Sequence, residues 1–256
     1  MPSGFIDLSV PLSNDGSPDP AGRPRIKYYN HKQTARGMAS FFRGLRKRDL
    51  PEQEGWAYER VRLSTHSGTH LDAPYHYAST MDGGKRAITI DEIPLSWCFQ
   101  VGIKLDFTAL PDGHVVSVEE VEAELERIEH RLSPLDIVLV NTAAGLAHGA
   151  RNYIDRGCGM GRAATLYLLE RGVRVTGTDG WSWDAPFVHT TKRFRETGDA
   201  TLIWEGHRAG REIGYCHIEK LCNLEAVPSK GFKVACFPVK IEGASAGWTR
   251  AVAIID

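Results

Sequence analysis

One short stretch, residues 66–77, constrains the fold and chemistry of this chain more than any other part of it. Four side chains that can bind a metal or move a proton lie there, each separated from the next by an even number of positions: His66, His70, Asp72 and His76. Gly68, Thr69 and Pro74 make the stretch a poor helix, so we expect extended chain. Because residues an even number apart on extended chain point to one side, the four groups are predicted to share a face.

The reach of each side chain predicts which groups can hold one cation. At a rise of roughly 3.3 Å per residue, His70 and Asp72 lie about 7 Å apart along the backbone and can contact the same ion. His66 and His76 would lie roughly 33 Å apart on a straight chain, so the chain must bend, and the glycine and proline between them allow it. Two imidazoles and a carboxylate suit zinc, manganese or iron and leave a position open for water and substrate. We therefore predict a catalytic metal site rather than a set of solvated loop histidines.

The same stretch resembles the signature of the cyclase superfamily of metal-dependent hydrolases, H-x-G-T-H-x-D-x-P-x-H. This superfamily includes bacterial kynurenine formamidase and isatin hydrolase. The chain matches the signature at His66, Gly68, Thr69, His70, Asp72, Pro74 and His76. The pattern D-L-S-x-P-L at residues 7–12 is similar to the opening strand of the family. The resemblance implies the swivelling β/β/α fold of that family, assembled as a homo-oligomer, either a homodimer or a homotetramer.

A second stretch, G-x-D-x-x-S-x-D at residues 177–184, resembles the second motif of the family. Asp179 and Asp184 follow a predicted strand and are either catalytic or part of a hydrogen-bonded brace. Because Asp and Ser commonly form loops, we favour the brace.

A third stretch surrounds Glu219. Formamidases of the family carry a histidine twelve residues before the glutamate of a G-x-x-x-x-E-N-L pattern, and here His207 stands twelve residues before Glu219. Lys220 replaces the asparagine of that pattern. His217 and Glu219 share one face if they lie on a strand, so the choice between His207 and His217 stays open.

The resemblance implies a role for each of these residues. His66, His70 and Asp72 would bind the metal, and Glu219 would complete or bridge the site. Either His207 or His217 would assist catalysis or bind a second ion. His76 would act as general base and then protonate the leaving nitrogen. The expected cofactor is a divalent cation, Mn²⁺ or Zn²⁺, because histidine and carboxylate ligands suit both.

Aromatic residues predict a flat substrate. Trp181, Trp183 and Phe187 cluster beside the second motif, where they suit either an aryl ring or a subunit contact. Trp56 is expected by default to anchor the core, and the resemblance to the family, which has an early aromatic substrate contact, makes substrate binding the alternative. With the resemblance, these residues imply a small aryl or cyclic amide as substrate. The W-S-W-D-A-P-F sequence at 181–187 favours the hydrolysis of isatin to isatinate over kynurenine formamidase activity.

Two other functional classes fit parts of the sequence. A cysteine hydrolase would use Cys216 with His217 as nucleophile and base, but adjacent residues on a strand point to opposite faces. A metal-binding protein without activity would hold its metal in a closed site, whereas three protein ligands leave a position open.

The composition argues against binding to nucleic acid or to a membrane. A formal net charge of −1 and a pI near 6.8 give no general attraction to nucleic acid or to anionic membranes. The sequence shows neither an apolar stretch that could span a bilayer nor a signal-peptide pattern at its N-terminus. The five cysteines are odd in number and never spaced C-x-x-C, which favours a reduced, cytoplasmic protein.

Hydrophobic periodicity predicts a mixed α/β domain that spans residues 1–256, with an N-terminal excursion at 13–56 and a short helix near 38–45. A capping box at Ser117 predicts a helix that ends at Pro134, and Gly172 closes a second helix over 161–171. Strands are expected at residues 5–12, 56–65, 99–107, 135–140, 173–176, 232–241 and 251–255.

Overall fold

The frame of the protein is a mixed sheet of nine strands in a computed structural model that describes residues 4–15 and 22–255. In spatial order the strands are β1 (Gly4–Asp7), β15 (Val252–Ile255), β13 (Phe232–Ala235), β7 (Phe99–Asp106), β9 (Ile137–Asn141), β11 (Val175–Thr178), β12 (Cys216–Glu219), β4 (His70–Asp72) and β14 (Ala246–Trp248). The central strands β7, β9, β11 and β12 run parallel, and the strands on either side pair antiparallel. The predicted α/β class is confirmed.

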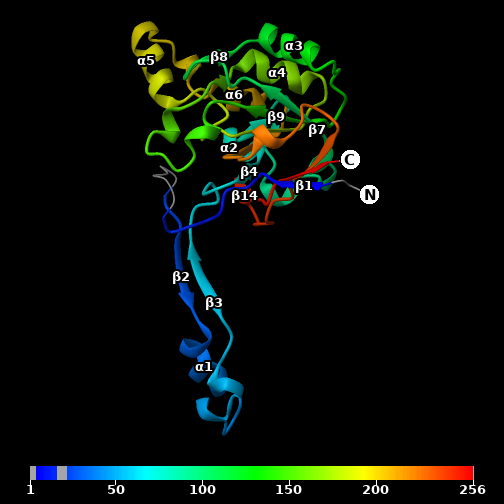
Figure 1. Ribbon diagram of the computed structural model, residues 1–256. Coiled ribbons are helices and arrows are strands. Elements are labelled where there is room, and N and C mark those ends of the chain that lie inside the picture. The colour runs from blue at the N-terminus through cyan, green and yellow to red at the C-terminus, as the bar shows by residue number, and fades with distance from the viewer. Residues whose placement is uncertain (1–3, 16–21, 256) are drawn as a thin grey trace.

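Helices cover one face of the parallel strands (Figure 1). Helix α3 (Val118–Arg127) connects β7 to β9, and α4 (Arg162–Glu170) connects β9 to β11. Every residue of β9 is buried, as expected for a parallel strand with both faces covered. Apolar side chains of α3 and α4 pack on Ile103 and Val138 of the sheet and form one of its two large cores.

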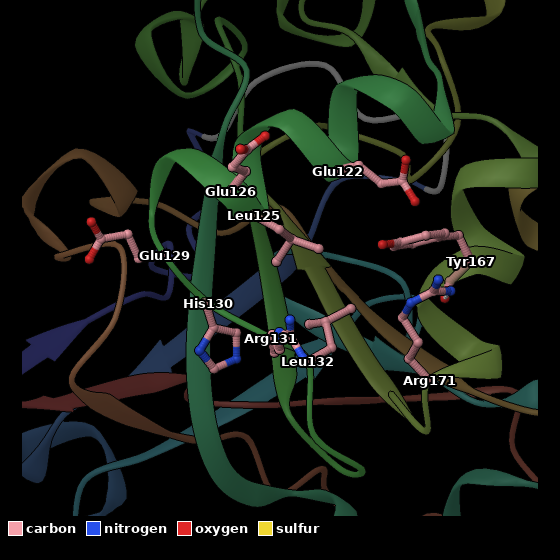
Figure 2. A pocket seen from close by; sticks show the side chains of 9 residues that line it. All are labelled: Glu122, Leu125, Glu126, Glu129, His130, Arg131, Leu132, Tyr167 and Arg171. Carbon is pink, nitrogen blue, oxygen red and sulfur yellow. Dashed lines mark hydrogen bonds between the residues drawn. The ribbon is translucent and has the colours of Figure 1, made fainter.

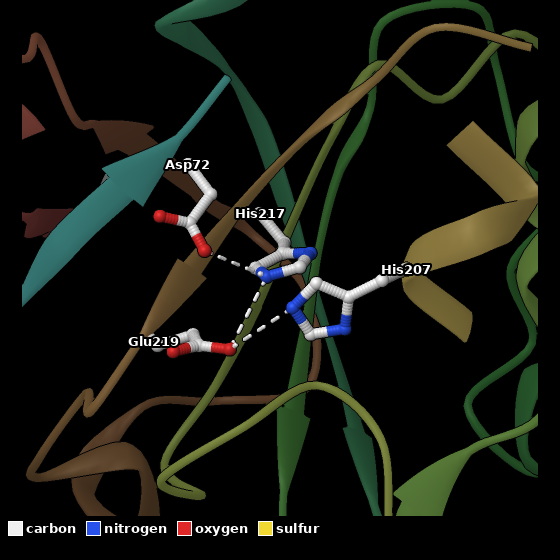
Figure 3. Close-up of side chains that lie close together, drawn as sticks. All are labelled: Asp72, His207, His217 and Glu219. Carbon is white, nitrogen blue, oxygen red and sulfur yellow. Dashed lines mark ion pairs between the residues drawn. The ribbon is translucent and has the colours of Figure 1, made fainter. Parts of the chain in front are cut away.

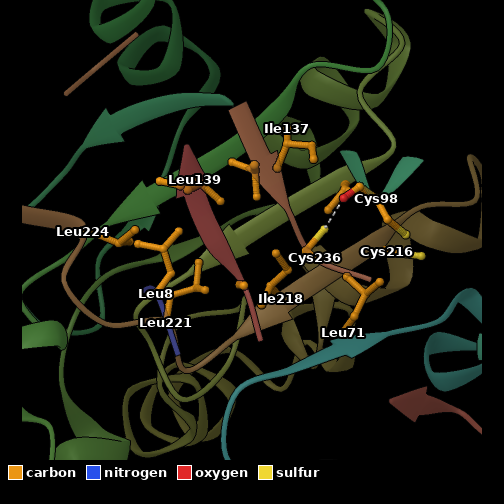
Figure 4. Packing of buried hydrophobic residues seen from close by; sticks show 14 of the residues in the cluster. Leu8, Leu71, Cys98, Ile137, Leu139, Cys216, Ile218, Leu221, Leu224 and Cys236 are labelled. Atoms are coloured by element: carbon orange, nitrogen blue, oxygen red, sulfur yellow. Dashed lines mark hydrogen bonds between the residues drawn. The ribbon is translucent and has the colours of Figure 1, made fainter. Parts of the chain in front are cut away.

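The second core fills the inside of the curled sheet (Figure 4). Ser9, just after β1, forms a β-bridge with Leu221, just after β12, so strands far apart in the sheet order approach one another. Leu8, Leu139 and Ile218 are fully buried in this cluster. The face of β12 and β4 that looks away from this core is therefore available for polar side chains.

An arm projects from the body of the protein (Figure 1). Strands β2 (Arg25–Tyr29) and β3 (Tyr58–Arg62) pair antiparallel, and α1 (His31–Ser40) lies at the far end. The helix predicted near 38–45 is therefore wrong in position. Asn30 and Gln33 form a capping box that starts the helix earlier, and that N-x-x-Q signal was missed.

Other predicted boundaries also differ. The helix that starts at Ser117 ends at Arg127 rather than at Pro134, because Glu129 adopts a left-handed conformation with φ +52°. The strand predicted over 232–241 ends at Ala235, and Pro238 forms only an isolated bridge. Strand β14 was not predicted. The end of the second helix at Gly172 was predicted correctly, and this glycine adopts φ +90°.

The remaining elements lie outside the nine-strand sheet. The helices are α2 (Pro74–Tyr77), α5 (Phe187–Thr197) and α6 (Glu205–Arg208), and the strands are β5 (Thr80–Met81), β6 (Lys85–Arg86), β8 (Val115–Val116) and β10 (Gly159–Met160). The 3₁₀ helices are η1 (Lys47–Asp49), η2 (Pro51–Gln53), η3 (Ile90–Glu92), η4 (Leu95–Trp97), η5 (Gly145–Ala147), η6 (Tyr153–Asp155), η7 (Ala200–Leu202), η8 (Ala209–Arg211) and η9 (Leu224–Ala226). Among the residues that the structure describes, no helix has the length and apolar character needed to cross a bilayer.

Candidate metal centre

Two neighbouring strands bring four potential ligands together. Strands β4 and β12 pair antiparallel, with His70 opposite Glu219 and Asp72 opposite His217. All four side chains are buried. The Nε2 atom of His217 lies 3.1 Å from Asp72 Oδ2 and 3.3 Å from Glu219 Oε1. The Nε2 atom of His70 lies 3.2 Å from Asp72 Oδ1 and 3.6 Å from Glu219 Oε2.

The residues between these ligands anchor the strands in the apolar core. Leu71 and Ile218 are opposite one another in the register, and both are fully buried in the cluster inside the sheet. Cys216 is in the same cluster, and burial raises its pKa well above the ordinary value. Cys216 and His217 therefore face opposite sides of β12, and a Cys216–His217 catalytic pair is not formed.

A turn brings His66 into the same space. Gly68 adopts φ +65°, and a Cβ atom on it would lie 2.6 Å from Cδ2 of Leu12. The turn places Nδ1 of His66 2.9 Å from Asp72 Oδ1. The Nε2 atom of His66 lies 3.0 Å from the hydroxyl of Ser245. The predicted bend at this glycine is confirmed, and it brings two histidines four residues apart to one carboxylate.

The predicted bend at Pro74 brings His76 back to the cluster. Pro74 is the first residue of α2, where the missing N–H of proline leaves no helical hydrogen bond unmade. The Nε2 atom of His76 lies 3.8 Å from Asp72 Oδ2, and its ring centroid lies 4.2 Å from that of His66. Burial lowers the pKa of His76 to about 4, so its imidazole is neutral near pH 7.

His207 approaches the cluster from helix α6. Its Nε2 atom lies 3.6 Å from Glu219 Oε1 (Figure 3). The carboxylate of Asp184 accepts a hydrogen bond from Nδ1 of His207 and further bonds from the backbone N–H groups of Gly206 and His207 at 2.7 and 3.1 Å. His207 and His217, the two histidines that the sequence left open, both reach Glu219.

Hydrogen bonds fix which ring nitrogen of each histidine faces the cluster. The Nδ1 atom of His70 lies 2.8 Å from the carbonyl of Gly68, which can only accept, so Nδ1 carries the proton. The Asp184 carboxylate fixes His207 in the same way. In both rings the lone pair of Nε2 is therefore directed at the carboxylates, as in histidines that ligate metals.

Buried polar atoms without a hydrogen-bond partner make this cluster suitable for a cation. Within the described part of the chain, both carboxylate oxygens of Asp72 and Nε2 of His217 are buried and have no hydrogen-bond partner of good geometry. Buried charges of this kind are normally paired or coordinate a metal. Burial opposes a charge on His217, but the nearby carboxylates of Asp72 and Glu219 raise its pKa to about 9. The two carboxylates thus favour a positive charge between them.

The ligand atoms form two groups that share one residue. Asp72, His207, His217 and Glu219 form one group, and His66, Asp72 and His76 form the other. Within each group, the ligand atoms all lie within 4.8 Å of one another. Asp72 has one oxygen toward His66 and the other toward His217, so it is placed to bridge two positions. Imidazole nitrogens with carboxylate oxygens suit zinc and manganese.

A cavity of about 310 Å³ opens onto the cluster. Its wall includes His66, His76, His207 and Glu219 together with the rings of three aromatic residues, Trp181, Phe187 and Trp204. The Trp181 and Phe187 rings meet edge to face at 5.3 Å. This volume lies at the small end of the range for ligand pockets, so it suits a small molecule with a flat ring.

The aromatic residues that were predicted to bind substrate lie in three different places. Trp181 and Phe187 line the cavity, whereas Trp183 is buried beneath it with 1% of its surface exposed. The indole N–H of Trp183 donates to Thr165 Oγ1 at 3.0 Å, and its ring lies 6.0 Å from that of His217. Trp56 lies at the base of the arm helix, 5.6 Å from the ring of Phe41, and is not part of the cavity wall.

Sequence reasoning missed Trp204. Its ring stacks on His207 at 4.4 Å with an interplanar angle of 11° and meets His76 at 5.1 Å. Trp204 adopts φ +59°, an uncommon conformation for a bulky residue. The signal was available, because this tryptophan stands three residues before His207.

Asp179 is a brace, as the sequence favoured. Its carboxylate accepts hydrogen bonds from the backbone N–H of Thr142 at 3.0 Å and from the Thr142 hydroxyl at 2.7 Å. Burial raises the pKa of Asp179 to about 7 even though these bonds act in the opposite direction. The brace joins the loops that follow β9 and β11 on the edge of the sheet where the cavity lies.

A larger cavity of about 840 Å³ lies between α3, the segment after it, and α4 (Figure 2). The guanidinium of Arg171 lies 3.3 Å from the Tyr167 ring centroid in its wall. Its lining residues belong to neither group of ligands. We therefore assign the chemistry to the smaller cavity.

Comparison with known proteins identifies the family. The family model Cyclase, described as "Putative cyclase", matches residues 6–185. The chain belongs to this cyclase family. It is 26% identical over 196 residues to a Salinibacter ruber (strain DSM 13855 / M31) protein named kynurenine formamidase, which covers 75% of this chain and 77% of that protein.

Solved structures share the fold. An isatin hydrolase bound to the product analogue thioisatinate has a TM-score of 0.75 at 17% identity, covering 98% of this chain and 92% of that chain. Isatin hydrolase A from Ralstonia solanacearum has a TM-score of 0.75 at 20% identity, covering 99% of this chain and 92% of that chain. A protein described as a potential metal-dependent hydrolase with cyclase activity has a TM-score of 0.65 at 17% identity, covering 99% and 98%. The predicted cyclase-superfamily fold is thus confirmed.

Asp72→Asn is expected to lose bound metal, because Asp72 is the one residue common to both groups of ligands. Elemental analysis of the purified variant beside the wild type is the measurement. Asp49→Asn, a carboxylate change in the arm, is the control and should keep the wild-type metal content. Full occupancy in Asp72→Asn would show that the cation binds elsewhere.

Proposed function

We propose that the protein is a metal-dependent hydrolase of a small aryl or cyclic amide. The observation that supports this most directly is that the Asp72 cluster of histidines and carboxylates opens into a small cavity with aromatic walls. Such a cavity with a few polar groups at one end is typical of a small-molecule site. The family and the names of the relatives agree with a hydrolase.

The residues around Asp72 supply the metal site of the proposed reaction. His66, His70 and Asp72 would hold one divalent cation, Mn²⁺ or Zn²⁺, and His207, His217 and Glu219 a second or the remainder of the coordination shell. When bound, the metal provides Lewis acidity toward the scissile carbonyl and lowers the pKa of water at the site. The hydrogen bonds of His70 and His207 keep their Nε2 lone pairs directed at it.

His76 is proposed as the proton-transfer group. Its imidazole lines the cavity beside His66, and burial lowers its pKa to about 4, so it is unprotonated near pH 7. It would accept a proton from the attacking water and then deliver it to the leaving nitrogen. Trp204 stacks on His207 and meets His76 edge to face, which limits how these two rings can turn.

Isatin-type cyclic amides are the first candidate substrates. Support comes from two solved isatin hydrolases of similar fold and from the aromatic rings of Trp181 and Phe187 in the cavity wall. The formamide of an aryl amine is the second candidate, because the curated relative at 26% identity is named kynurenine formamidase. We propose no nucleic-acid or membrane partner. A cytoplasmic location is supported by the free state of the five cysteines.

Chelation combined with a substrate screen tests the proposal. Purified enzyme would be assayed on isatin, N-formylkynurenine and simple cyclic imides before and after metal removal. A metal-dependent hydrolase stops turning over but stays largely folded, and added metal restores it. A protein whose metal is structural would unfold, and activity that survives chelation would contradict the proposal.

His76→Ala is expected to keep the metal and to lose most of the turnover. Proton transfer by a placed side chain is worth on the order of 10²–10⁴-fold in rate. Steady-state kinetics with elemental analysis measures both quantities, and His114→Ala, outside the cluster, is the control. Loss of metal in His76→Ala would make this residue a ligand and require a different base.

Trp181→Ala and Trp183→Ala are expected to behave differently. Removal of the Trp181 ring from the cavity wall should raise KM for an aryl amide much more than it lowers kcat, as expected when uniform binding is lost. Trp183→Ala should instead destabilise the fold by ~3–5 kcal/mol, because the ring is fully buried. Steady-state kinetics and urea denaturation distinguish the two. An unchanged KM in Trp181→Ala would remove this ring from the substrate site.

The arm is proposed to contact a second copy of the chain, in a homodimer or homotetramer. Phe41, Phe42 and Trp56 are 74%, 53% and 45% exposed, and apolar groups clustered on a projecting segment are typical of an interface. Phe41→Asp should lower the mass measured by light scattering, whereas Leu95→Asp on the body should not. A wild-type chain that is monomeric at assay concentration would refute the assembly.

A further inference from the structure

Charge is divided unevenly between the arm and the rest of the chain. From the start of β2 to the end of β3, residues 25–62 contain ten lysines and arginines but four aspartates and glutamates, a net charge of +6. The whole chain has a net charge of −1, so the remaining residues together carry −7. Because the arm projects away from the body (Figure 1), it presents its positive charge to solvent or to another molecule.

Like charges face each other across the two strands of the arm. The register pairs Arg25 with Arg62 and Lys27 with Arg60, and all four residues are exposed. Directly opposite residues lie on one side of a two-stranded ribbon, and so do residues two apart, so the four side chains share one face. We call it the basic face. Like charges directly opposite one another destabilise a sheet, and a single two-stranded hairpin is marginally stable by itself.

The basic face lacks negative charge of its own. Within residues 4–15 and 22–255, none of its four side chains forms an ion pair. An acidic partner would therefore offset the repulsion across the strands and stabilise the arm.

The aromatic pair on the same face favours a protein partner over nucleic acid. The rings of Tyr29 and Tyr58 stack on each other at 4.7 Å with an interplanar angle of 12°. Nζ of Lys27 and Cζ of Arg60 lie 5.0 and 5.7 Å from the Tyr29 ring centroid. Proteins that bind single strands use aromatic rings on which a base can stack. Here the rings already stack on each other, so carboxylates on a protein surface are the better match.

Helix α3 carries the opposite charge. Six of the twelve residues 118–129 are glutamates. The one basic residue among the twelve, Arg127, is paired with Glu124 at 2.7 Å. Three exposed glutamates, spaced three and four residues apart, form an acidic stripe along one side of the helix: Glu119, Glu122 and Glu126.

The two surfaces are suited to meet between two copies of the chain. The arm and α3 lie at opposite ends of the molecule (Figure 1), so they are not in contact within one chain. Charges repeat roughly every 7 Å along each strand of the basic face and roughly every 5–6 Å along the stripe, so several pairs can form at once. We propose that the basic face of the arm binds the acidic stripe of α3 on a second copy. A twofold axis makes this contact twice and closes a homodimer.

This inference rests on the assembly proposed above and adds the surface that the arm contacts. The test reverses the charge of each surface in turn. Arg60→Glu combined with Arg62→Glu reverses the basic face, and Glu122→Lys combined with Glu126→Lys reverses the stripe. Like charges then face each other across the contact, so each double variant is expected to raise the dimer Kd by roughly 100-fold. Light scattering over a concentration series measures Kd.

Mixing the two double variants separates this contact from every other. In a 1:1 mixture, the reversed arm of one chain meets the reversed helix of the other, and the two unchanged surfaces meet at the second contact. The mixture is therefore expected to dimerise with nearly the wild-type Kd, although each variant alone does not. A mixture that stays monomeric would overturn the inference.

Controls keep the result decisive. Lys192→Glu combined with Glu242→Lys changes two exposed positions outside both surfaces and should leave Kd unchanged. The reversed arm places opposite charges across its own strands, so it is expected to stay folded, which circular dichroism checks. A fluorescent single-stranded oligonucleotide that binds the wild type but not the reversed arm, with no dimer in the mixture, would assign the basic face to nucleic acid instead.

The outcomes also distinguish this inference from the proposed function. A wild-type dimer that neither double variant weakens would keep the assembly and refute only the contact between the arm and α3. A monomeric wild type would refute both. Neither result depends on turnover, so hydrolysis of an aryl amide can fail while the charge-reversed mixture still dimerises.

Discussion

The pairing of β4 with β12 is the constraint on which the rest of the site depends. Two cross-strand pairs, His70 with Glu219 and Asp72 with His217, stand on one face, and the residues between them are buried in the core on the other. Because side chains alternate with a period of two, a slip of one residue would carry every ligand into the apolar cluster. The hydrophobic core thus fixes the register, and the register fixes the geometry of the metal site.

The other residues of the site are positioned by groups that take no part in the proposed reaction. Gly68 allows the turn that brings His66 to Asp72, and Asp184 holds His207 while it accepts hydrogen bonds from the backbone of α6. Buried carboxylates without such partners are costly, so the cluster forms only where the surrounding fold is rigid enough to impose it. The Asp179 brace between two loops contributes to that rigidity.

Sequence patterns over a few residues predicted the part of the site that depends on the local backbone conformation. The shared face of His70 and Asp72, the bends on either side and the shared face of His217 and Glu219 all follow from backbone geometry over a few residues. The meeting of His207 with Asp184 does not, because these two residues lie 23 positions apart in the sequence. The prediction that residues 66–76 are all extended is wrong, because His66 lies in a turn and His76 in α2. Trp181 and Trp183 have equal parity, yet one lines the cavity and the other is buried, since a loop has no fixed alternation. The arm helix was misplaced because its cap lies in a segment with little apolar periodicity.

The end of β12 shows how one backbone conformation positions two neighbouring side chains of the candidate site. Glu219 is the last residue of the strand and belongs to the metal cluster, and Lys220 is the first residue beyond it and belongs to the cavity wall. The left-handed conformation at Lys220 separates these two roles, because it stops the alternation that would otherwise place a charge in the core. The bond from Lys220 to the His66 carbonyl then ties the strand end to the turn that carries another ligand. The end of one strand therefore fixes a potential ligand, a buried cation and the turn at His66, so a change in how this strand ends would displace all three.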